Sequence, residues 1–130
     1  MSLNVSADLI AKAAIDQVEE ATFVESIRES LPYAWGIVEQ LAFQIHEGND
    51  EWANHAVAPP SEQARAQLLR MMGGDAIRRS TERHFGIKLA FQNCHNVGAF
   101  RSDALNSAAY QNFISIRSQI LNQTPELKDC

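Results

Sequence analysis

The sequence has few of the features that mark membrane proteins or small disulfide-stabilised secreted proteins. Its 130 residues include two cysteines, Cys94 and Cys130, which are too few for a disulfide framework. No apolar run approaches the roughly 20 residues that cross a bilayer. The start, MSLNVSADLI, has no basic segment followed by an apolar one, as a secretory signal would. We therefore expect no membrane association and a cytoplasmic location.

Strand signals are also scarce. We find no alternating run of β-branched residues that ends in a hairpin dipeptide, and no internal repeat or low-complexity tract. The hydrophobic content of 45% and the charged content of 21% are typical of a folded globular protein. A chain of this length can bury a real core without covalent cross-links.

Helix signals, by contrast, recur along the chain. Ser6, Ser61 and Ser102 stand where a hydroxyl group caps a helix start. Pro32 fits a first helical turn, and Gly86 fits a helix end. Apolar residues between these signals follow the spacing of one helical face. The clearest such stripe, assigned to a last helix that begins at Ser102-Asp103, is Leu105, Ala109, Phe113, Ile116 and Ile120.

These signals predict an all-α fold. We expect residues 1–130 to form a single helical domain, a compact bundle of five to six helices. Its longest irregular connection is the crossing around residues 47–60, which contains EGNDEWANHAVAPP. Residues 1–5 and 123–130 are expected to be flexible ends.

The stretch LAFQNCHNVGAF, residues 89–100, is the most distinctive segment. Between its apolar ends it carries Gln92, Asn93, Cys94, His95 and Asn96. If residues 88–101 are helical, Cys94 faces the core as a small hydrophobic residue. The next side chain, His95, then points about 100° away, so the two cannot pair. The amides either bind a ligand or partner, or form a satisfied polar layer.

Catalysis or metal binding would need residues that only folding can bring together. A nucleophilic Cys94 would have to recruit His46, His55 or His84 as its base. None of the histidines forms the His-x-x-x-His or Glu-x-x-His pair that places two ligands on one helical face. We predict no metal and no cofactor, with His46, Glu47 and His55 as the weak metal candidates.

Charge is distributed unevenly along the chain, whose formal net charge is −5. Residues 1–60 hold ten acids and two bases, whereas residues 61–130 hold six acids and nine bases. Six of the bases lie between Arg65 and Lys88. The candidate basic patch within this cluster comprises Arg70, Arg78, Arg79, Arg83 and Lys88. Such a split is typical of two halves that pack face to face, of self-association, or of a patch for an anionic partner.

We expect a small regulatory or accessory protein that acts through protein–protein contacts, as a homodimer or with another protein. Catalysis is the less favoured interpretation. An enzyme, or a small-ligand or metal-binding protein that uses Cys94, His95 and histidines brought near by folding, is the alternative. The third hypothesis is a nucleic-acid-associated protein that uses the Arg65–Lys88 cluster.

Overall fold

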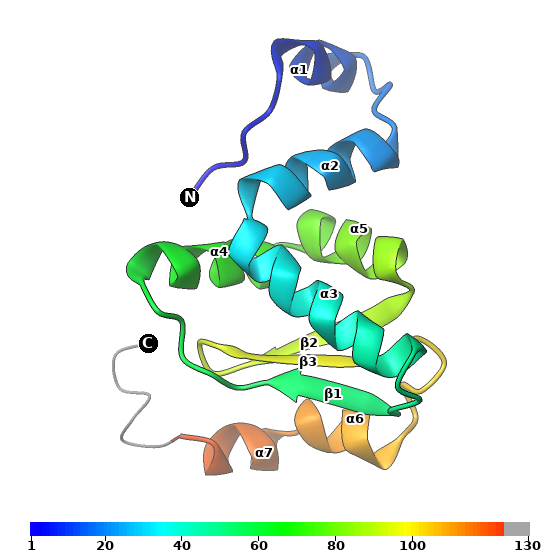
Figure 1. Ribbon diagram of the computed structural model, residues 1–130, viewed down its shortest axis with the longest axis vertical. Coiled ribbons are helices and arrows are strands. Elements are labelled where there is room, and N and C mark those ends of the chain that lie inside the picture. The colour runs from blue at the N-terminus through cyan, green and yellow to red at the C-terminus, as the bar shows by residue number, and fades with distance from the viewer. Residues whose placement is uncertain (124–130) are drawn as a thin grey trace.

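The computed structural model describes residues 1–123, and these residues form a three-stranded antiparallel sheet covered by helices (Figure 1). In chain order the elements are α1 (Ala7–Ala14), α2 (Glu20–Ser30), α3 (Pro32–His46), β1 (Trp52–His55), α4 (Glu62–Gly73), α5 (Asp75–Phe85), β2 (Ile87–Gln92), β3 (Asn96–Arg101), α6 (Ala108–Phe113) and α7 (Ile116–Leu121). No helix within residues 1–123 combines the length and apolar character needed to cross a membrane. Of the predicted flexible end at residues 123–130, residues 124–130, with Cys130, lie outside the described residues.

The sheet has the strand order β1-β3-β2, so β3 is its central strand. Trp52 of β1 lies opposite Phe100 of β3, and Gln92 of β2 lies opposite Asn96. The hairpin between β2 and β3 turns through three residues, of which Asn93 has a φ of 57°. Asparagine tolerates this left-handed conformation better than most residues, so the turn needs no glycine.

Helices lie on both sides of the sheet (Figure 1). The helices α3, α4 and α5 cover one face, α2 packs on α3 and α5, and α1 lies farthest from the sheet. The opposite face carries the short helices α6 and α7. We call these two surfaces of the sheet the upper face and the lower face.

The upper face contains the hydrophobic core. Strand side chains alternate between the two faces, and Leu89, Val97 and Ala99 point into the upper layer. They pack in one buried cluster with residues of α3 and α4, including Ile45 and Leu68. Burial of such aliphatic side chains provides the main driving force for folding.

The outer edge of the sheet is covered at β2. The backbone N–H of Leu89 donates to Oε2 of Glu82 at 2.8 Å, and the Lys88 ammonium lies 3.5 Å from the same oxygen. Glu82 is buried in the last turns of α5. At the other edge, β1 has only four residues.

The predicted all-α bundle is wrong, because the fold is mixed helix and sheet. The segment 88–101, interpreted as a helix, forms most of β2 and β3. The crossing at 47–60 contains β1. Both strands of the hairpin do alternate: Ile87 and Leu89 are buried in the core, and Ala90 and Gln92 point to the lower face. Leucine, alanine, phenylalanine and glycine carry this alternation, so a search for β-branched runs misses it.

The predicted last helix is also wrong in its extent. Instead of one helix from Ser102, two six-residue helices form, capped by Ser107 and Ser115. Of the expected apolar stripe, Phe113 is buried, whereas Ile116 and Ile120 are exposed. The helical conformation is interrupted at Ile114, because this residue is the C-cap of α6 and the next residue, Ser115, is the N-cap of α7.

The other helix signals are confirmed. The Ser6 hydroxyl accepts the backbone N–H of Leu9, and the Ser61 hydroxyl accepts that of Ala64, both at 3.1 Å. Pro32 lies in the first turn of α3. Gly86 ends α5 in the left-handed conformation, with a φ of 65°. Local capping chemistry therefore determines these helix ends.

Candidate functional site

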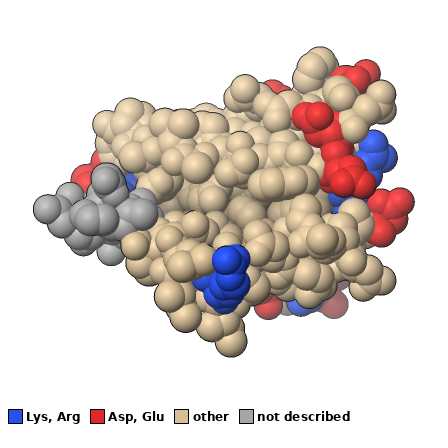
Figure 2. Space-filling model, turned by 90° about the horizontal axis from the view of Figure 1, so that it is seen from below, with Lys and Arg blue, Asp and Glu red and all other residues tan. Residues whose placement is uncertain are grey.

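The surface formed by α6 and α7 over the lower face of the sheet is almost free of charge. Residues 104–123 contain one charged side chain, Arg117. In Figure 2, which views the molecule from this side, neutral residues fill most of the surface and acidic side chains gather at its margin. We call this surface the α6–α7 face. Its neutrality contrasts with the formal net charge of −5 of the whole chain.

The buried amide of Gln92 fastens α6 and α7 to the sheet. Its Nε2 donates to the carbonyl oxygen of Phe113 at 2.6 Å and to Oγ of Ser118 at 2.9 Å. Its Oε1 accepts from Nδ2 of Asn122 at 2.7 Å and from Nδ2 of Asn96 at 3.0 Å. The side chain is only 4% exposed, so these four hydrogen bonds satisfy a group that would otherwise be costly to bury.

The other amides of the central stretch are also engaged within the chain. Oδ1 of Asn96 accepts from Nδ2 of Asn54 at 3.0 Å, which links β3 to β1. Oδ1 of Asn93 accepts from Nε2 of Gln123 at 2.9 Å. The amides predicted to bind a ligand or partner thus mainly connect the hairpin with β1 and with the residues at the end of α7.

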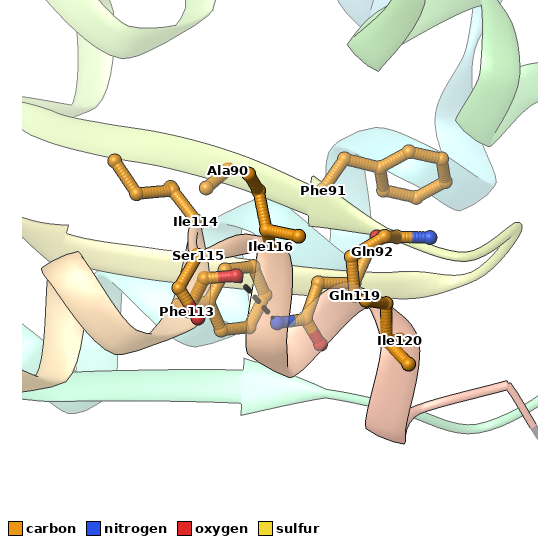
Figure 3. A pocket seen from close by; sticks show the side chains of 9 residues that line it. All are labelled: Ala90, Phe91, Gln92, Phe113, Ile114, Ser115, Ile116, Gln119 and Ile120. Carbon is orange, nitrogen blue, oxygen red and sulfur yellow. Dashed lines mark hydrogen bonds between the residues drawn. The ribbon is translucent and has the colours of Figure 1, made fainter.

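An apolar groove lies between β2 and the two short helices (Figure 3). Its volume is about 390 Å³. The residues that line it, shown in Figure 3, are Ala90, Phe91, Gln92, Phe113, Ile114, Ser115, Ile116, Gln119 and Ile120. Strand residues form one wall, and the helices with their connection form the other. We call this hollow the isoleucine groove.

Three isoleucines of the groove are unusually exposed. Ile114, Ile116 and Ile120 are 51%, 81% and 64% exposed. Single exposed apolar residues are common, but a contiguous group marks an interaction surface. The sequence stripe placed Ile116 and Ile120 in the core, so this surface was missed. The signal that could have found it is the Phe-Ile-Ser-Ile segment, in which Ser115 can cap a new helix and so interrupt the stripe.

A second hollow lies on the other side of α6 and α7, towards β1. Its volume is about 240 Å³, and its lining consists of amides, one hydroxyl group and aromatic or small side chains. Trp52 forms part of the wall and stacks on Phe100, with ring centres 5.7 Å apart and an interplanar angle of 6°. The Phe113 ring meets Trp52 edge-on at 6.3 Å. We call this hollow the amide pocket.

Cys94 and His95 lie at the tip of the hairpin. Both are buried, and Sγ of Cys94 is 3.4 Å from Nδ1 of His95. The expectation that consecutive side chains diverge here is wrong, because the segment is a three-residue turn and not a helix. The imidazole beside the sulfur is therefore that of the next residue.

The remaining histidines occupy separate positions. Nε2 of His46 donates to the carbonyl oxygen of Phe85 at 2.7 Å. The ring of His84 contacts that of Trp35, with centres 5.1 Å apart. His55 ends β1, opposite Val97. Within residues 1–123, no group of three or more histidine, cysteine or acidic side chains is placed to hold a metal ion, including the candidates His46, Glu47 and His55.

Carboxylates neutralise much of the candidate basic patch. Arg78 pairs with Asp75 at 2.8 Å and Lys88 with Glu82 at 3.5 Å. Arg83 of α5 pairs with Glu20 of α2 at 2.8 Å. In the described residues, Arg70 and Arg79 are the members of the patch that form no ion pair. Little concentrated positive charge is left to attract an anionic partner.

The ion pairs lower the pKa values of two carboxyl groups. The hydrogen bond from Arg83 holds the pKa of Glu20 below its usual 4.5. The hydrogen bond from Arg78 holds the pKa of Asp75 below 3.8, with a contribution from the nearby charge of Arg79. Both carboxyl groups therefore remain charged at neutral pH.

Comparison with known proteins identifies one family. Its sequence model matches residues 1–130, the whole chain, and its description is NucS shadow ORF. Neither the curated proteins nor the solved structures contain a match. The chain therefore belongs to the NucS shadow ORF family.

Proposed function

We propose that the protein acts by binding, as a small regulatory or accessory protein that forms a homodimer through its α6–α7 face. The observation that supports this proposal is the exposed group Ile114, Ile116 and Ile120 on a nearly uncharged surface. Apolar residues that remain in water in a monomer gain free energy when a partner covers them.

Charge favours a second copy of the chain as the partner. A two-fold symmetric contact places the same patch of both copies together, so like charges at the patch would repel each other. The rest of the surface carries the excess acidic charge of a protein with a net charge of −5. The α6–α7 face is where two copies can approach without that repulsion.

An interface of ordinary size would occupy a small part of the surface of this protein. A stable interface of ordinary size buries about 800 Å² on each partner. That is about a tenth of the 7788 Å² accessible surface of this protein. The isoleucine groove provides an apolar centre for such an interface, and Leu121 at the end of α7 is also 60% exposed.

The test is sedimentation equilibrium of the recombinant chain at several concentrations, after circular dichroism has established that it is folded. The wild-type protein should be dimeric, and Ile120→Lys should be monomeric because it places a charge in the apolar contact. Ile15→Lys is the matched control. Ile15 is 63% exposed, follows the last turn of α1, and lies on the other side of the molecule from the α6–α7 face.

The control should remain dimeric, and circular dichroism should show that both variants are folded. A wild-type protein that is monomeric at every concentration would refute the homodimer. A dimer that both lysine variants weaken equally would refute the assignment to this face. A dimer that neither variant weakens would do the same.

A nucleic-acid-associated protein is the second candidate. One observation favours it: the name of the matching family carries the label KH, which denotes a nucleic-acid-binding module. KH modules clamp the nucleic-acid backbone with a GXXG loop. No two of the six glycines in this chain stand three residues apart, so this loop is absent. Arg70 and Arg79 would have to provide the contact.

This candidate predicts salt-dependent retention of a single-stranded oligonucleotide. Binding at low salt that weakens as salt rises, and that Arg70→Ala with Arg79→Ala reduces, would support it. An absence of binding at low salt would refute it.

A further inference from the structure

We propose that the amide pocket binds one planar, uncharged heterocycle, with the chemistry of an adenine ring. The ring would lie against Trp52, and side-chain amides would hydrogen-bond its edges. The exposed isoleucines that support the proposed homodimer line the other hollow, although Gln92 and Phe113 contribute to both.

The composition of the lining restricts the charge of the ligand. The pocket is lined by side chains from β1, the hairpin, α6 and the end of α7, and none of them is ionisable. A charged ligand would lose its hydration here without gaining a counter-charge. A purely apolar ligand would cover amides and leave them without hydrogen bonds. A neutral ligand with its own donors and acceptors avoids both costs.

The pocket still has hydrogen-bonding capacity after its internal contacts are counted. Nδ2 of Asn54 and Nδ2 of Asn122 donate within the protein, while Oδ1 of each remains as an acceptor within the described residues. The side-chain amide of Asn112 has no hydrogen bond to the described part of the chain and offers both a donor and an acceptor. An asparagine amide can pair with the amino group and N7 of adenine.

The stacking surface is held in place before a ligand arrives. Trp52 is fixed by its parallel stack on Phe100 and its edge contact with Phe113, and it is still 39% exposed. Among the amides that line the pocket, those of Gln92, Asn96 and Asn122 are held by the hydrogen bonds of Gln92. Such support lowers the entropy cost of binding.

The volume restricts the size of the ligand. About 240 Å³ is below the roughly 300–1,000 Å³ of most small-molecule sites. One ring system fits this space better than a whole nucleotide. The adenine ring could belong to a free nucleoside or to a base of a single strand, because aromatic side chains stack on bases in both.

The test is isothermal titration of the purified protein with adenosine, which is uncharged, and with methyl glucoside as a non-planar ligand that also forms hydrogen bonds. Adenosine should bind saturably with a Kd below about 1 mM, and methyl glucoside should not bind. The variant Asn112→Ala should bind adenosine about fivefold more weakly, as expected for a lost neutral hydrogen bond.

The matched control is Asn106→Ala, which removes an exposed asparagine amide outside the pocket and should leave the Kd within about twofold. Trp52→Phe should weaken binding while it retains an aromatic ring at this position. An adenosine pentamer distinguishes the two origins of the adenine ring. Affinity more than tenfold above that of adenosine indicates a base of a single strand, and equal affinity indicates a free nucleoside. The proposal is overturned if adenosine does not bind, if methyl glucoside binds equally well, or if both asparagine variants have equal effects.

Discussion

The two faces of the sheet are covered in different ways. On the upper face, aliphatic residues of α3 and α4 pack on Leu89 and Val97 in one continuous core. On the lower face, the short helices are held by the aromatic contacts of Phe113 and by the hydrogen bonds of Gln92. Two hollows and a group of exposed isoleucines remain there. The upper face therefore accounts for stability, and the lower face is where binding is proposed.

The largest effect should come from a cavity on the upper face. Leu68 of α4 is fully buried in the core, so Leu68→Ala should lower the free energy of unfolding by about 2–5 kcal/mol. Urea denaturation measures this loss. Leu69→Ala is the control, because Leu69 is 47% exposed and its truncation should cost much less. Equal losses for the two variants would contradict the assignment of the core to this face.

A smaller effect should come from crowding on the lower face. A methyl group at Gly98 would lie 2.8 Å from Cζ of Phe113, a distance that forces the ring to move. Gly98→Ala should cost about 2 kcal/mol, and the displaced Phe113 should alter the near-ultraviolet circular dichroism. Gly36→Ala in α3 is the control, because nothing lies within 4 Å of the added methyl group. It should be neutral or stabilising, since alanine favours a helix.

The loss of the Gln92 amide should act locally. Gln92→Leu leaves the Phe113 carbonyl without its donor and removes one of the two acceptors of the Asn122 amide, at a cost of about 1–2 kcal/mol. Hydrogen exchange should accelerate in α6 and α7 and remain unchanged in α3. Gln119→Leu removes an exposed glutamine amide of α7 and should leave the exchange rates close to those of the wild-type protein. Uniform acceleration in α3 and α7 would mean that the two faces do not open separately.

The smallest effect concerns the ion pair between Glu20 of α2 and Arg83 of α5, above the upper face. Because the pKa of Glu20 is lower in the folded protein, the pair stabilises above the unfolded value of about 4.5. This contribution is lost as the pH falls through the lowered pKa. The urea midpoint of Glu20→Gln should therefore lie slightly below that of the wild-type protein at pH 7 and equal it in strong acid. Glu51→Gln, in an exposed loop, should show no such pH dependence.

Sequence patterns predicted the parts of the fold that depend on local chemistry. The serine caps at Ser6 and Ser61 and the glycine end at Gly86 are satisfied by atoms within a few residues, so the sequence contains their cause. The helices on the upper face were therefore found, and Trp35, Leu41 and Ile45 of α3 are buried there. Long helices with one apolar face are the elements most easily recognised from a sequence.

The hairpin was missed because its stabilising contacts are distant. Gln92 gains its partners from Phe113, Ser118 and Asn122, which lie at least 21 residues away. Its turn depends on Asn93 and not on the glycine dipeptide that marks two-residue hairpins. The central stretch was singled out correctly as unusual. Its amides, however, became hydrogen-bonded links between strands and helices, which only the folded arrangement reveals.

The buried carboxylate of Glu82 has a consequence for how copies of this protein can associate. By accepting the Leu89 N–H, it occupies an outward-facing donor of the β2 edge, and the opposite edge strand has only four residues. Neither border of the sheet therefore offers a long free ladder to which another chain could add a strand. This arrangement disfavours edge-to-edge aggregation. Copies of the protein would therefore associate through side-chain surfaces and not through backbone pairing.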